Sequence, residues 1–109
     1  MKLDRNINPG GMGKYAVLKL RVLKCLQELG HMDPRVAQAI ETLEAADLLD
    51  WGNTPQTEFM LIRLKDKYAQ PALYAYADAA RNDDPEYASE IADMAARSGP
   101  AHPFCKRPD

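Results

Sequence analysis

Two segments of the chain, 14–22 and 58–64, alternate between apolar and polar positions with a period of two. Such alternation is typical of a strand that buries one face. Residues 15–21 and 59–65 also share one pattern: an aromatic residue, three apolar residues, a base, a leucine and a second base. The pattern predicts two similar amphipathic strands. Residues 14–22 fit equally well the start of a helix that continues to Leu29, and the pattern leaves this alternative open.

Elsewhere the apolar positions recur with a helical period. The pattern predicts one helix over residues 34–47, a second from Pro71 and a third from Pro85. Asp33-Pro34 and Asp84-Pro85 each place a capping carboxylate before a proline suited to the first helical position. Gly99-Pro100 predicts a firm stop after the third helix.

The resulting order is strand, helix, strand, helix, helix. We therefore expect an α+β domain over residues 14–99, with a short two-stranded sheet packed by about three helices. A flexible lead-in over 1–13 would precede it, and an irregular tail over 100–109 would follow. Parallel strands would need a right-handed crossover through the 34–47 helix, and the sequence does not choose between parallel and antiparallel pairing. An exposed strand edge would also allow a homodimer.

Composition narrows the class of protein. The 109 residues suit one domain, and contents of 46% hydrophobic and 28% charged residues are ordinary for a globular protein. A net charge of −2 gives no general attraction to nucleic acid or to an anionic membrane. No apolar run approaches the roughly 20 residues of a membrane span, and no signal-peptide core is present, so we expect a soluble, cytoplasmic protein.

Motifs for chemistry are weak. Gly10-Gly11-Met12-Gly13-Lys14 lacks the hydroxyl residue and the first glycine of a phosphate-binding loop. The spacings of Cys25, His31, His102 and Cys105 match no common zinc site. We therefore predict no catalytic residues, no metal site, no cofactor and no enzymatic activity.

Acidic residues gather in the C-terminal part. Glu86, Glu90 and Asp93 are spaced i, i+4 and i+7, so they share one helix face. Such a row can simply be a solvated face near a helix N-terminus. It can also form a docking surface for a basic partner, such as a protein that normally holds nucleic acid. The predicted protein-binding residues are Asp83, Asp84, Glu86, Glu90 and Asp93.

Basic residues give the alternative prediction, a small nucleic-acid-binding regulator. With parallel strands, several bases would lie on one face of the sheet and could contact phosphates. The 34–47 helix, a polar turn and the 58–64 strand also resemble the recognition helix and wing of a winged-helix module. That helix is acidic, however, and acids there repel phosphates. The predicted nucleic-acid-binding residues are Lys14, Lys19, Arg21, Lys24, Arg63 and Lys65.

Three stretches, RNINPGGMGKYAVLKLR, EFMLIRLKDKYA and GPAHPFCKRPD, resemble small uncharacterised accessory proteins of tailed bacteriophages and prophages. The resemblance covers nearly the whole chain and implies a biological context but no site residue. Small phage accessory proteins typically bind and disable a host protein, including defence machinery as anti-CRISPR proteins do, or regulate transcription. The resemblance therefore implies a non-enzymatic protein that inhibits or redirects a host protein in the cytoplasm of a bacterial host.

Overall fold

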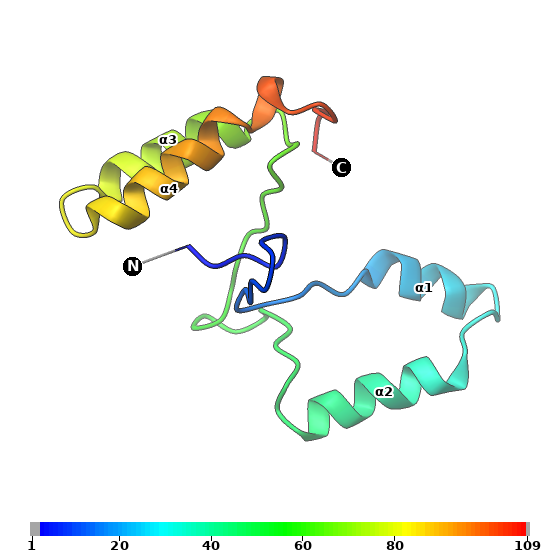
Figure 1. The fold of residues 1–109 in the computed structure, drawn as a ribbon. Helices are drawn as coiled ribbons and strands as arrows, with labels where there is room; N and C mark the ends of the chain where they lie inside the picture. Colours follow the sequence, from blue (N-terminus) through cyan, green and yellow to red (C-terminus); the bar gives the residue numbers. More distant parts are fainter. Residues whose placement is uncertain (1–2, 109) are drawn as a thin grey trace. The chain divides into compact units, whose positions relative to one another are not determined.

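The computed structural model describes residues 3–108, which form four α-helices and one short 3-10 helix (Figure 1). No β-strand occurs among these residues, and their only β-bridge is an isolated one between Asp66 and Lys106. The predicted α+β fold with a two-stranded sheet is therefore wrong, and the described part of the chain is helical. The helices are α1 (Leu20–Glu28), α2 (Pro34–Ala45), α3 (Ala69–Ala80), α4 (Pro85–Ala96) and the 3-10 helix η1 (Gly99–Ala101).

Both segments predicted as strands are irregular where they are not helical. Residues 14–19 have no regular structure and Leu20 begins α1, so the helical alternative is correct from Leu20 onwards. Residues 58–63 are also irregular, and the wing that a winged helix requires is absent from this segment. A strand is stable only when a neighbouring strand takes its backbone hydrogen bonds. Residues 20–28 form their backbone hydrogen bonds within helix α1. The first predicted strand is therefore not available to pair with residues 58–64.

The chain divides into two compact units, residues 3–14 with 61–108 and residues 15–60. We call them the C-terminal unit and the central unit. The predicted boundaries of a lead-in, a single domain over 14–99 and a tail remain a prediction.

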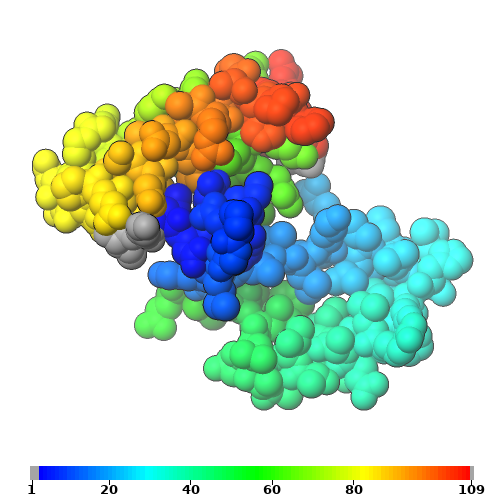
Figure 2. All heavy atoms as spheres, viewed as in Figure 1, coloured from blue at the N-terminus to red at the C-terminus, as the bar shows by residue number. Residues whose placement is uncertain are grey.

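The C-terminal unit is built on an antiparallel hairpin of α3 and α4, which lie side by side (Figure 1). Its yellow-green and orange atoms form one continuous body in the space-filling view (Figure 2). Apart from Ile91, the buried hydrophobic side chains of these helices are alanines, which lets the two backbones approach closely. Gln70 ties the hairpin together because its side-chain amide donates to the carbonyl of Ala95 over 3.2 Å. The buried residues of the hairpin and its end are Ala69, Ala77, Ala88, Ile91, Ala95, Ser98 and Gly99.

The hairpin ends where the sequence predicts a stop. The Ser98 hydroxyl donates to the Ala95 carbonyl over 2.7 Å, and the Gly99 N–H donates to the Leu64 carbonyl over 2.8 Å. Gly99 has a φ of 58°, in the left-handed region that favours glycine. The prediction of a helix stop at Gly99-Pro100 is confirmed.

The central unit contains α1 and α2, joined by a short connection. The predicted start of α2 at Pro34 is confirmed, with Asp33 as its cap: the carboxylate accepts from the Arg35 N–H over 2.9 Å and pairs with the Arg35 guanidinium at 2.8 Å. Unlike α3 and α4, these two helices do not pack along each other, and neither holds a buried residue.

Candidate functional site

The start of α4 is set by its first residues. Asp84 caps the helix, since its carboxylate accepts from the Tyr87 N–H over 3.1 Å, and Pro85 occupies the first position. This cap is the one the sequence predicts. It fixes the direction in which α4 leaves the α3–α4 turn, and with it the face that carries the predicted acidic residues.

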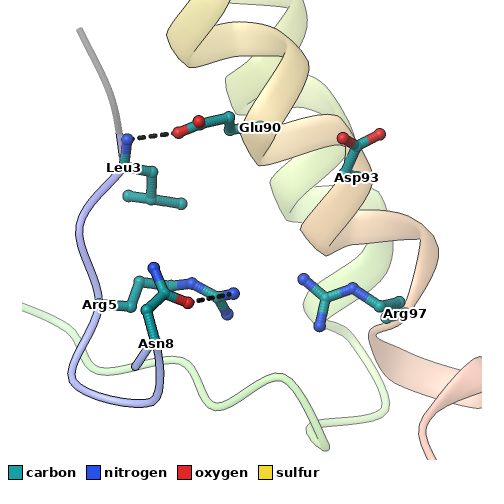
Figure 3. A pocket seen from close by; sticks show the side chains of 6 residues that line it. All are labelled: Leu3, Arg5, Asn8, Glu90, Asp93 and Arg97. Carbon is teal, nitrogen blue, oxygen red and sulfur yellow. Dashed lines mark hydrogen bonds between the residues drawn. The ribbon is translucent and has the colours of Figure 1, made fainter. Parts of the chain in front are cut away.

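The structure separates these five acidic residues into two groups. Asp84 and Glu90 are half-buried and accept hydrogen bonds from the backbone. Asp84 caps α4, and a Glu90 carboxylate oxygen accepts from the backbone N–H of Leu3 (Figure 3). The other three, Asp83, Glu86 and Asp93, are exposed on the turn and on α4. We call Asp83, Glu86 and Asp93 the acidic patch.

Beside the first turn of α4, two tyrosines connect the helices of the hairpin. The rings of Tyr76 on α3 and Tyr87 on α4 meet edge to face, with centroids 6.2 Å apart and an interplanar angle of 76°. Their hydroxyl oxygens lie 3.3 Å apart. This hydrogen bond, followed by partial burial and the nearby charges, raises the pKa of Tyr87 to about 12. Tyr87 therefore stays neutral over the physiological range, and the two rings form an aromatic surface next to the Asp84 carboxylate.

Sequence spacing alone does not pair Tyr76 with Tyr87, because the two residues belong to separate helices. Tyr76 is in fact 53% exposed, while Tyr87 is half-buried. A usable signal was present: the two residues stand at similar distances from the turn at 81–84, and an antiparallel hairpin brings such positions together.

The lead-in contributes a small cavity against α4. Its volume is ≈ 190 Å³, and Arg5, Asn8 and Asp93 are among the residues around it (Figure 3). The Arg5 guanidinium donates to the Asn8 side-chain oxygen over 3.4 Å and contacts the Met94 sulfur at 3.6 Å. Glu90 and Asp93 contribute two carboxylates to the wall, and Arg5 and Arg97 contribute two guanidinium groups. Leu3 and Asn8 complete the lining.

The predicted basic surface is not assembled by a sheet, because neither residues 14–22 nor residues 58–64 form a strand. Lys14, Arg63 and Lys65 belong to the C-terminal unit. Lys19, at the N-terminal end of α1, and Arg21 and Lys24, within α1, belong to the central unit. The basic residues are therefore divided between the two units.

The Cys and His residues show no grouping for metal binding. Across residues 3–108, no group of three or more His, Cys, Asp or Glu side chains is placed to hold a metal ion. His102 instead accepts, through Nδ1, a hydrogen bond from the Phe104 N–H over 3.0 Å. Cys25 and Cys105 are free thiols at exposed positions.

Comparisons with known proteins place no family on this chain: no family model matches, and neither a curated protein nor a solved structure does. Among the described residues, no helix is both long and apolar enough to cross a membrane.

Proposed function

We propose that the protein is a non-enzymatic accessory protein of the phage type, which binds a basic host protein through the acidic patch and inhibits or redirects it. The site of action would be the cytoplasm of a bacterial host. The observation that carries this proposal is that two of the five acidic residues form hydrogen bonds to the backbone while the other three are exposed. Two carboxylates hold α4 in place, so that Asp83, Glu86 and Asp93 are presented at exposed positions of one packed hairpin.

The tyrosine pair supports a protein partner. Tyrosines supply large contact area at low entropy cost and are enriched at the centres of protein interfaces. Tyr76, half exposed and held by Tyr87, offers such a contact next to the carboxylates. Acidic residues around an aromatic contact suit a partner with a basic face, including one that normally binds nucleic acid.

The test is capture of a partner from bacterial lysate treated with nuclease, with the wild-type chain compared to Asp83→Asn/Glu86→Gln/Asp93→Asn. These changes remove three charges and leave the Asp84 cap and Glu90 in place. We expect the triple variant to lose the captured protein, and raised salt to weaken capture by the wild-type chain.

A matched control is Glu28→Gln/Asp47→Asn/Glu58→Gln, which removes the same charge at exposed positions of the central unit. It should capture the partner as the wild type does. Equal capture by the wild type and the acidic-patch variant would contradict the proposal. Capture that disappears with nuclease would favour the nucleic-acid-binding alternative.

A further inference from the structure

The cavity between the lead-in and α4 contains a cation that no carboxylate neutralises. Arg5 is half-buried, and within residues 3–108 its guanidinium donates only to neutral groups, the Asn8 side-chain oxygen at 3.4 Å and the Met94 sulfur at 3.6 Å. A partly desolvated cation normally lies against a carboxylate, because burial of an unpaired charge is costly. A guanidinium has five N–H donors, so Arg5 has donors left for an anion.

A second guanidinium faces Arg5 across the cavity. Figure 3 shows Arg97, at the C-terminal end of α4, with its guanidinium pointing toward that of Arg5. Arg97 forms no ion pair within residues 3–108. Two like charges that face each other repel, and an anion between them removes the repulsion. Because guanidinium groups bind carboxylates through two parallel hydrogen bonds, this end of the cavity suits a carboxylate.

Two carboxylates form the other end of the cavity. Glu90, Asp93 and Arg97 are spaced i, i+3 and i+7, so they share one face of α4. One Glu90 oxygen accepts from the Leu3 N–H, whereas Asp93 is exposed and forms no ion pair in the described part of the chain. Four residues of helix separate Asp93 from Arg97 by roughly 6 Å along the axis. The cavity is therefore negative at one end and positive at the other.

We propose that this cavity binds a small aliphatic zwitterion, with its carboxylate between Arg5 and Arg97 and its ammonium against Asp93 and Glu90. The two guanidinium groups and two carboxylates carry no net charge together, so a ligand with one charge of each sign matches them better than a simple anion does. A few methylene groups between the ammonium and the carboxylate span the interval between the two ends.

The size and the position of the cavity agree with such a ligand. Its volume of ≈ 190 Å³ holds about six water-sized groups, since a water molecule takes about 30 Å³. All residues that line it belong to the C-terminal unit, so the site is complete within that unit. The inference goes beyond the proposed function and shares only Asp93 with it.

The experiment is an NMR titration of the isotopically labelled full chain with γ-aminobutyrate. Butanoate and butylammonium, which carry one charged group each, are titrated for comparison. We expect γ-aminobutyrate to shift the Nε–H signals of Arg5 and Arg97. It should bind about tenfold or more tightly than either comparison probe, because it forms charge-assisted hydrogen bonds at both ends of the cavity.

Each end of the cavity has its own variant. Arg97→Gln, at an exposed position, should weaken γ-aminobutyrate and butanoate alike by about tenfold or more. Asp93→Asn should weaken γ-aminobutyrate but not butanoate, because it removes only a partner of the ammonium. The matched controls, Arg107→Gln and Glu58→Gln, change exposed charges outside the cavity and should bind as the wild type does. Helical circular dichroism checks that each variant is folded.

Three outcomes would overturn the proposal. The first is the absence of saturable γ-aminobutyrate binding up to millimolar concentrations. The second is equally tight binding of butanoate, which would make the cavity a simple anion site. The third is equal γ-aminobutyrate binding by the wild type and by folded Arg97→Gln and Asp93→Asn chains.

Partner capture separates this proposal from the proposed function. Arg97→Gln keeps all three carboxylates of the acidic patch, so it should still capture the protein partner from lysate while it loses γ-aminobutyrate. A failure of the zwitterion site therefore leaves partner capture intact, and a failure of partner capture leaves the titration unchanged.

Discussion

The hydroxyl oxygens of Tyr76 and Tyr87 lie 3.3 Å apart and join α3 to α4 near the turn that connects the two helices. Either hydroxyl can donate. The bond links two residues that are 11 positions apart in sequence, and it stands next to the turn that carries Asp83 and Asp84. The proposed binding surface is therefore tied to the packing of the hairpin.

Removal of this bond should change the ionisation of Tyr87. In Tyr76→Phe we expect the pKa of Tyr87 to fall from about 12 towards its ordinary value of 10.0, because the hydrogen bond is the largest cause of the shift. An absorbance titration of phenolate near 295 nm measures the change. Tyr74→Phe, which removes another exposed tyrosine of α3 and leaves the Tyr76–Tyr87 hydrogen bond intact, should leave the high-pH step in place.

The same bond makes stability depend on alkaline pH. Because the pKa of Tyr87 is raised in the folded chain, its contribution to stability is complete below pH 10 and is lost as the pH rises to about 12. The midpoint of urea unfolding should fall in this window for the wild type. A Tyr76→Phe chain with the same fall in this window would contradict the assignment.

The cap of α2 should be sensitive to acid. The Arg35 side chain, and after it the Arg35 N–H, holds the pKa of Asp33 below its ordinary value of 3.8. The stabilisation is therefore present above pH 3.8 and is lost as the pH falls through the lower pKa of the folded chain. Asp33→Asn keeps a capping oxygen that does not titrate, so its helical circular dichroism should change less between pH 5 and 2 than that of the wild type.

Close packing of α3 on α4 should make the hairpin intolerant of larger side chains. Ala77 is fully buried at this contact, and Ala77→Leu should cost about 1–3 kcal/mol of unfolding free energy, because the helices must move apart. Ala79→Leu, at an exposed position of the same helix, is the control and should be nearly neutral. Equal destabilisation by the two variants in urea unfolding would show that α3 does not pack on α4 through Ala77.

Substitutions at Gly30 and Gly99 should distinguish the cost of backbone strain from the cost of steric crowding. Gly30 has a φ of 73° with open space around it, so Gly30→Ala should cost about 1 kcal/mol from backbone strain alone. At Gly99 an added Cβ would also lie 3.1 Å from the Gln70 Cβ. We therefore expect Gly99→Ala to be the more destabilising of the two in urea unfolding. The reverse order would show that crowding at Gly99 is relieved by movement of Gln70.

The sequence by itself determined the features that depend on neighbouring residues. Asp33-Pro34 and Asp84-Pro85 mark the starts of α2 and α4, because capping and the proline φ act within a few residues. Gly99 marks the end of the hairpin for the same local reason. The composition of the α4 face, with its row of carboxylates, could also be read from spacing alone.

Only the tertiary structure decided whether the segments without capping or proline signals form helices or strands, and which distant residues contact each other. Alternation in 58–64 describes a strand, yet a strand needs a partner far away in sequence, and 20–28 forms a helix instead. The bond from Leu3 to Glu90 and the Tyr76–Tyr87 pair likewise join residues that local patterns treat separately. Hydrogen bonds between distant segments depend on how helices pack, and this is why one acidic row became two structural carboxylates and three exposed ones.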